Sequence, residues 1–85
     1  MKLLKFGAPW CSMCKVQDNI LKDINEIDIT YINIDEDFDG NLTKKYQIKS
    51  LPTLVILGDK GQILYKYSGI KQANEIKEII NSLKE

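Results

Sequence analysis

The chain contains no histidine, and only two of its 85 residues are cysteine and two are proline. The absence of histidine excludes a Cys–His nucleophilic pair and removes the commonest metal ligand. A structural zinc site needs four ligands, which two cysteines without histidine cannot supply within one chain. We therefore expect no metal and no other cofactor. A metal or iron–sulfur cluster shared between two copies is the alternative that this count leaves open.

An excess of charge of either sign is also absent. Twelve basic and twelve acidic residues give a formal net charge of zero, and the lysines are spread along the chain. Because nucleic-acid binding needs a basic surface, we expect no nucleic-acid partner. No apolar run approaches the roughly 20 residues of a membrane span, and residues 1–5 break their apolar run too early for a signal peptide. We expect no membrane partner and a location in the cytoplasm.

The hydrophobic pattern is that of one small α/β domain over residues 1–85. Apolar and β-branched runs predict strands at 3–6, 29–34, 54–57 and 62–67. Helical spacing predicts a helix from Ser12, a short one near 41–46 and an amphipathic one at the C-terminal end. The resulting order, β-α-β-α-β-β-α, favours a parallel first βαβ unit and a final antiparallel hairpin.

Two of these helices carry a clear apolar stripe. In the first helix we expect the stripe to face the core, with Gln17 and Asp18 among the polar residues on the other faces. The apolar residues of that helix are Val16, Ile20, Leu21, Ile24 and Ile27. In the last helix they are Ala73, Ile76, Ile79, Ile80 and Leu83.

The two cysteines are three positions apart, where the first strand gives way to the first helix. Residues at this spacing are neighbours on a helix face, so Cys11 and Cys14 can come within disulfide range. At a helix N-terminus, free backbone N–H groups and the helix dipole stabilise a thiolate at Cys11. A bond across so short a loop adds little stability. The spacing therefore predicts a redox-active pair, with Cys11 as nucleophile and Cys14 as resolving thiol.

Several segments resemble the sequence signatures of the thioredoxin family and follow one another in the same order. They are residues 6–15, which include Trp10-Cys11-Ser12-Met13-Cys14, and residues 31–35, 45–48, 50–54 and 68–70. The resemblance covers essentially the whole chain. It implies the thioredoxin fold in a minimal β-α-β-α-β-β-α form, with a four-stranded mixed sheet flanked by three helices. The N-terminal strand and helix of full thioredoxins have no counterpart, which leaves a core of glutaredoxin size.

The same resemblance implies a substrate site around the cysteines. Pro52 is expected to follow a cis peptide bond and to face the sulfurs across a groove, which leaves the Leu51 backbone to pair with an extended substrate. An ordinary trans proline at the start of a strand is the alternative. The expected substrate-binding residues are Trp10, Ser12, Met13, Ile34, Ser50, Leu51, Pro52, Gly69 and Ile70.

Three features depart from the family pattern. Ser12-Met13 replaces the Gly-Pro dipeptide between the cysteines, which restores a backbone N–H near the sulfur. Lys5 stands where most thioredoxins have a buried aspartate that is proposed to take the proton of the resolving cysteine, and Tyr31 replaces that aspartate's lysine partner. Lys5 could tune the pKa values of the cysteines, but we expect its ammonium to reach water instead. The sequence does not reveal which base serves Cys14.

The leading hypothesis is a thiol–disulfide oxidoreductase that reduces disulfide-containing proteins and is recharged by a thioredoxin-reductase-like electron donor. We expect a monomer. A glutaredoxin-like, glutathione-linked reductase is the second hypothesis. The short core favours it, whereas Trp10 and the lone Gly69 speak against a glutathione site. A non-catalytic thioredoxin-fold binding module is the third.

Overall fold

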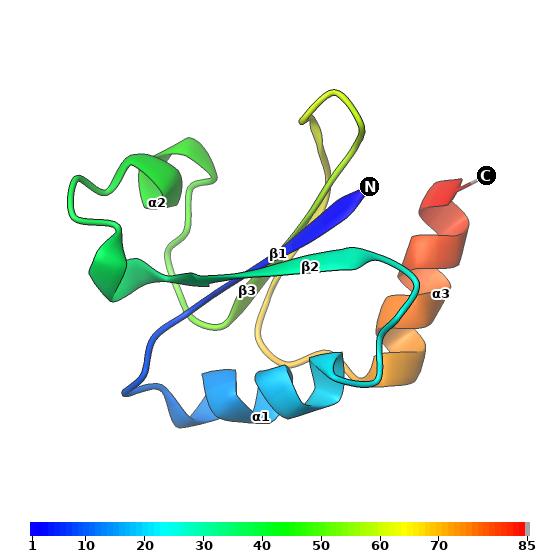
Figure 1. Cartoon of the computed structure of the whole chain (residues 1–85), viewed down its shortest axis with the longest axis horizontal. Helices are drawn as coiled ribbons and strands as arrows, with labels where there is room; N and C mark the ends of the chain where they lie inside the picture. The colour runs from blue at the N-terminus through cyan, green and yellow to red at the C-terminus, as the bar shows by residue number, and fades with distance from the viewer. Residues whose placement is uncertain (85) are drawn as a thin grey trace.

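The computed structural model describes residues 1–84, which form four strands and three α-helices (Figure 1). In chain order these are β1 (Lys2–Gly7), α1 (Ser12–Leu21), β2 (Asp28–Asn33), α2 (Asn41–Lys45), β3 (Thr53–Leu57), β4 (Ile63–Ser68) and α3 (Ala73–Lys84). A short 3-10 helix, η1 (Ile34–Glu36), follows β2. The predicted order of elements is confirmed. The first helix is shorter than expected and ends before Ile24 and Ile27.

The strands form one mixed sheet in the order β2-β1-β3-β4. β1 and β2 are parallel, whereas β3 is antiparallel to both of its neighbours. The βαβ unit and the terminal hairpin are therefore as predicted. Because β1 is an inner strand, the surrounding sheet fixes the place where it ends and α1 begins, and the cysteines lie at that place.

Helices cover both faces of the sheet, with α1 and α3 on one face and α2 on the other (Figure 1). All five residues of β3 are buried, as expected for an apolar strand covered on both sides. The core on the α1–α3 side contains Leu3, Leu21, Ile24, Leu54, Ile56, Ile76 and Ile80. The core on the α2 side contains Leu4, Phe6, Tyr46, Val55 and Leu57.

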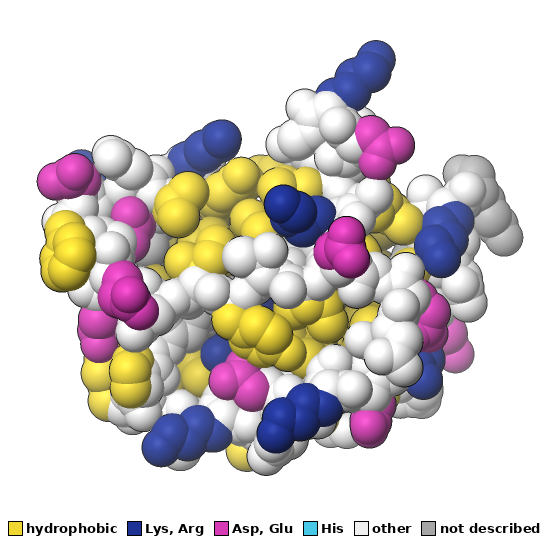
Figure 2. All heavy atoms as spheres, viewed as in Figure 1, with side chains coloured by type: hydrophobic (Ala, Val, Ile, Leu, Met, Phe, Trp, Pro, Cys, Tyr) yellow, Lys and Arg dark blue, Asp and Glu magenta, His cyan; other side chains and the backbone are white. Residues whose placement is uncertain are grey.

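The surface carries mixed charge. Figure 2 shows lysine and acidic side chains interspersed on one face of the molecule, as the balanced composition predicts. No helix within residues 1–84 combines the length and the hydropathy of a membrane span. Two exposed aromatic side chains, Trp10 after β1 and Phe38 after β2, lie beyond the carboxyl ends of the parallel strands.

The orientation of α1 corrects one expectation. Val16 is half exposed, whereas Gln17 is completely buried, the reverse of what the apolar pattern predicts. The Gln17 side chain accepts a hydrogen bond from the Lys71 N–H at 2.7 Å and donates one to the Lys71 carbonyl at 3.0 Å. A buried amide with both hydrogen bonds made is well tolerated. These bonds join α1 to the segment that precedes α3.

The short helix α2 is held near its N-terminus by Asp37. Its carboxylate accepts hydrogen bonds from the N–H groups of Thr43 at 3.0 Å and Leu42 at 3.4 Å. These hydrogen bonds favour the charged carboxylate, and the one from the Thr43 N–H has the largest effect. They hold the pKa of Asp37 below its ordinary value of 3.8.

We expect Asp37→Asn to destabilise the protein at neutral pH and to make no difference in acid. With the pKa lowered in the folded state, the stabilisation is present above the unfolded-state pKa and disappears as the pH falls through the folded-state value. Urea unfolding at a series of pH values from neutral downward measures this. The exposed Asp39→Asn variant is the control, and we expect it to match the wild type. A deficit in Asp37→Asn that is the same at every pH would contradict the assignment.

Candidate active site

Cys11 is the N-cap residue of α1, and its sulfur is bonded to that of Cys14. The two Cα atoms are 5.3 Å apart, a usual separation for a disulfide. The Cys11 sulfur also accepts a hydrogen bond from the backbone N–H of Cys14 at 3.2 Å. Among the described residues, the Cys14 N–H is the backbone donor to this sulfur. The expected strand–turn–helix context is present.

The two cysteines differ in exposure. Cys14 is 1% exposed, whereas Cys11 is partly exposed. The first turn of α1 carries no acidic residue that would oppose a negative charge on the Cys11 sulfur, and its free N–H groups and dipole favour one. The surroundings therefore suit an accessible thiolate at Cys11 and a protected thiol at Cys14.

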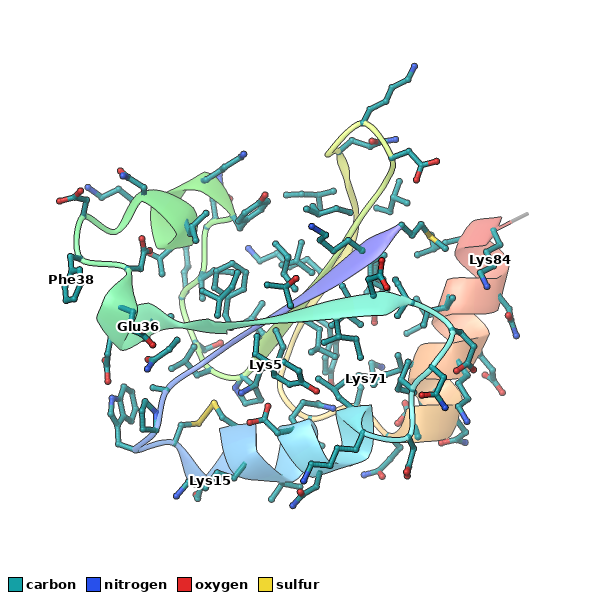
Figure 3. The ribbon with its side chains drawn as sticks, in the orientation of Figure 1. Lys5, Lys15, Glu36, Phe38, Lys71 and Lys84 are labelled. Carbon is teal, nitrogen blue, oxygen red and sulfur yellow. A yellow bond between two sulfur atoms is a disulfide. The ribbon has the colours of Figure 1, made fainter. Side chains whose placement is uncertain are left out.

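The expectation that the ammonium of Lys5 reaches water is wrong. Lys5 is only 4% exposed, and its ammonium lies 2.7 Å from Oδ1 of Asp18 on α1. Figure 3 shows the side chain pointing from β1 toward α1, on the side where the disulfide lies. Because β1 is an inner strand and α1 covers this face, the side chain has no short path to bulk water. A buried ammonium needs a partner of opposite charge, and Asp18 provides it.

Gly7 brings Lys5 close to the cysteines. A Cβ added at Gly7 would lie within 3.1 Å of both the Lys5 Nζ and the Cys14 Sγ. The ammonium and the sulfur therefore border the same small space, which any side chain at this position would fill. Tyr31 is the β2 neighbour of Lys5. Burial, and secondarily the Asp18 carboxylate, raise the pKa of Tyr31, so its hydroxyl keeps its proton at neutral pH.

A groove of about 320 Å³ lies beside Cys11 and brings together residues that are distant in sequence. Five residues that the sequence indicated line it, namely Trp10, Cys11, Ile34, Ser50 and Leu51. Ile48 and Lys49, which the sequence did not indicate, complete the lining. The remaining candidates, Ser12, Met13, Pro52, Gly69 and Ile70, are not among the lining residues.

The Leu51–Pro52 peptide bond is cis, as the family resemblance implies. Pro52 is buried, and its carbonyl accepts a hydrogen bond from the Gly69 N–H at 2.8 Å, which brings two of the candidate residues together. The Thr53 hydroxyl donates to the Ser50 carbonyl at 2.6 Å and so closes the turn. The backbone of Leu51 makes no hydrogen bond to another described residue, which leaves it available to a bound segment.

Trp10 is 69% exposed and is oriented by Asp35 of η1. Its indole N–H donates a hydrogen bond to the Asp35 carboxylate at 3.1 Å. The indole is thus anchored at one edge while most of its surface stays open to solvent. This arrangement leaves a large apolar contact surface next to Cys11.

These features define a site for dithiol–disulfide exchange: an accessible cysteine at a helix N-terminus, a buried cysteine one turn later and a cis-proline turn at the adjoining groove. Among residues 1–84, no group of three or more Cys, Asp or Glu side chains is arranged to hold a metal ion.

Comparison with known proteins agrees with this class. The Thioredoxin family model matches residues 1–82. Thioredoxin of Mycoplasmoides gallisepticum is 30% identical over 80 residues, which cover 92% of this chain and 79% of that protein. Thioredoxin of Bacillus subtilis is 30% identical over 82 residues, covering 93% and 78%. The structure of a mutant thioredoxin from Halobacterium salinarum superposes with a TM-score of 0.83 at 27% identity, covering 98% and 74%.

The chain belongs to the thioredoxin family. It is a thiol–disulfide oxidoreductase that reduces disulfides, and its partners are disulfide-containing proteins and a reductase that restores the dithiol. The hypothesis of a thiol–disulfide oxidoreductase and the predicted thioredoxin fold are both confirmed.

Sequence reasoning missed four residues around the site. Ile48 and Lys49 directly precede the Ser50-Leu51-Pro52 segment, so their proximity to the groove could have been anticipated. Asp18 lies four residues after Cys14, which places both on the same helix face. No sequence signal indicated that Asp35 contacts Trp10, because this contact depends on how η1 follows β2.

Proposed function

We propose that Cys11 attacks the substrate disulfide and that Cys14 resolves the resulting mixed disulfide. The Cys11 thiolate bonds to one substrate sulfur, and the other leaves as a thiolate. The Cys14 thiolate then attacks the Cys11 sulfur, forms the internal disulfide and releases the second substrate thiol. Two electrons pass from the cysteine pair to the substrate disulfide. The difference in exposure between the two cysteines is the observation that carries this division of roles.

We propose that the groove beside Cys11 holds an extended substrate segment. The free backbone of Leu51 offers strand-like hydrogen bonds. Trp10, Ile34 and Leu51 provide apolar contacts. Ser12, Met13, Ser50, Pro52, Gly69 and Ile70 are proposed as further contacts around the same site, and the hydrogen bond between Gly69 and Pro52 supports their proximity.

We further propose a thioredoxin-reductase-like electron donor, a monomeric state and a location in the cytoplasm. A dithiol that acts as a reductant must be regenerated, which a reducing compartment with a dedicated reductase allows.

Limited alkylation of the reduced protein tests the division of roles. With substoichiometric iodoacetamide at neutral pH, we expect Cys11 to be labelled at least about tenfold faster than Cys14, because reactivity follows exposure and thiolate character. Peptide mapping by mass spectrometry reads out both sites. In urea the preference should vanish, which controls for reagent bias. Equal or faster labelling of Cys14 in the folded protein would contradict the assignment.

A further inference from the structure

The reaction leaves one proton without an assigned acceptor. Cys14 is buried, so it must lose its thiol proton inside the protein before it can attack the mixed disulfide. The charged side chain buried beside the Cys14 sulfur is Lys5. An ammonium can stabilise the resulting thiolate but cannot accept a further proton.

Asp18 is the carboxylate that pairs with Lys5 in the described structure. It lies on α1 four residues after Cys14, and such residues are neighbours on one helix face. Its Oδ1 is buried and lies 2.7 Å from the Lys5 ammonium, while 38% of the side-chain surface remains exposed. The contact is an ion pair by distance, yet Oδ1 meets hydrogen-bond geometry with no described residue. One carboxylate therefore reaches both the buried ammonium and solvent.

A pocket of about 290 Å³ links this ion pair to the surface. Lys5 and Asp18 line it together with Gly7, which separates Lys5 from the Cys14 sulfur. The other titratable groups that line the pocket are Lys15 from α1 and Tyr31 from β2, and the Cys14 sulfur lies across the space at Gly7. Tyr31 keeps its proton at neutral pH and Lys15 is a cation, so Asp18 is the one acceptor among the titratable residues that line the pocket.

We propose that Lys5 and Asp18 form the proton-accepting pair of the resolving step, a role that rests on the proposed division of labour between Cys11 and Cys14. As Cys14 forms its bond to the Cys11 sulfur, the Lys5 ammonium gives one proton to the Asp18 carboxylate, and the amine so formed takes up the proton of Cys14. Lys5 thus remains an ammonium beside the reacting sulfur. Asp18 then releases the proton through the pocket to water. The substrate sulfur leaves as a thiolate and takes a proton from solvent.

Reaction of the reduced protein with dithiobis(nitrobenzoate) separates the two steps. Attack by Cys11 releases a first equivalent of coloured nitrothiobenzoate, and attack by Cys14 on the mixed disulfide releases a second. In stopped-flow absorbance near neutral pH, Asp18→Asn should slow the second phase at least about tenfold, since proton transfer to a positioned group contributes about 10²–10⁴-fold. The first phase should keep its wild-type rate.

Three further readouts distinguish this role from a structural one. Asp18→Glu, which keeps the carboxylate, should restore the second phase to within about threefold of wild type. The deficit of Asp18→Asn should shrink as the pH rises, because hydroxide then removes the Cys14 proton. Lys5→Met should slow the second phase, and Lys5→Met/Asp18→Asn should be no slower than the slower single variant, because the two residues act as a unit. The matched control is Asp23→Asn, an exposed carboxylate just after α1, which should change neither phase.

Each outcome is decisive. A second phase of wild-type rate in Asp18→Asn, with the first phase intact, would overturn the proton-accepting pair. A deficit that Asp18→Glu does not repair and that is independent of pH would also overturn it. If Asp18→Asn unfolds because the Lys5 ammonium has lost its partner, the second phase is measured in Lys5→Met/Asp18→Asn instead. That double variant removes both charges. A wild-type protein that shows no second phase at all would instead refute the proposed roles of the cysteines.

Discussion

Replacing Cys11 by serine will reduce the rate of protein disulfide reduction to that of the uncatalysed reaction. Serine keeps the shape of the side chain but cannot form the thiolate that attacks a disulfide. The N-terminus of α1 stabilises that thiolate, and no other cysteine in the chain is exposed enough to replace it. Insulin reduction by dithiothreitol, followed as turbidity, measures the loss.

Cys14→Ser is the informative counterpart, because it removes only the resolving step. We expect a stable mixed disulfide between Cys11 and the substrate, visible on a non-reducing gel and dissolved by added thiol. Circular dichroism of both reduced variants checks the fold. If Cys11→Ser retained catalysis, or if Cys14→Ser accumulated no mixed disulfide, the order of attack would be wrong.

Truncating Ile80 to alanine will remove a large part of the stability. Ile80 is completely buried on α3 and lies in the core cluster that joins this helix to β1, β3 and α1. Such truncations cost about 2–5 kcal/mol, whereas a domain of this size has roughly 0.05–0.15 kcal/mol of stability per residue. At the middle of both ranges the protein should lose about 40% of its free energy of unfolding.

Urea unfolding of the oxidised proteins measures this change as a shift in midpoint at an unchanged slope. Val16→Ala is the matched control, since Val16 is an aliphatic helix residue that is half exposed. Away from buried positions, surface substitutions usually change stability by about 0.5 kcal/mol or less. A loss in Val16→Ala as large as that in Ile80→Ala would mean that α1 and α3 are packed differently from this description.

The order of strands and helices could be predicted because each element carries its own local signal. The apolar run of β3 indicates a strand covered on both faces, and the stripe through Ile76 and Ile80 indicates which face of α3 is buried. The position of Cys11 at the start of α1 follows from the same local pattern. The cysteine pair and its place between a strand and a helix were therefore predictable from sequence.

The orientation of α1 was not predictable from hydrophobicity alone. Cys14 and Gln17 both face inward. The Cys14 sulfur is bonded to that of Cys11, and the Gln17 amide makes both of its hydrogen bonds with the Lys71 backbone. The disulfide is local, whereas the Gln17 amide makes a tertiary contact with a residue 54 positions along the chain. The pattern of apolar residues predicts that Gln17 faces water. Its hydrogen bonds with the Lys71 backbone allow it to be buried instead.

The burial of Lys5 has the same kind of cause. A lysine in an edge strand can reach water more easily than one in an inner strand. The place of a strand in the sheet follows from the strand order and not from the sequence of the strand itself. β1 lies between β2 and β3, and α1 covers Lys5, so the ammonium pairs with Asp18. The groove likewise combines Trp10, Ile34 and residues 48–51, which only the fold brings together.

A single turnover of the wild-type protein with a disulfide-bonded peptide tests the dithiol mechanism most directly. The fully reduced protein is mixed with one equivalent of peptide, quenched in acid at short intervals and mapped by mass spectrometry. We predict that the peptide appears first on Cys11 alone and that one Cys11–Cys14 disulfide then forms for each peptide disulfide reduced. Peptide bound first to Cys14, or reduction of the peptide without formation of the Cys11–Cys14 bond, would contradict the mechanism.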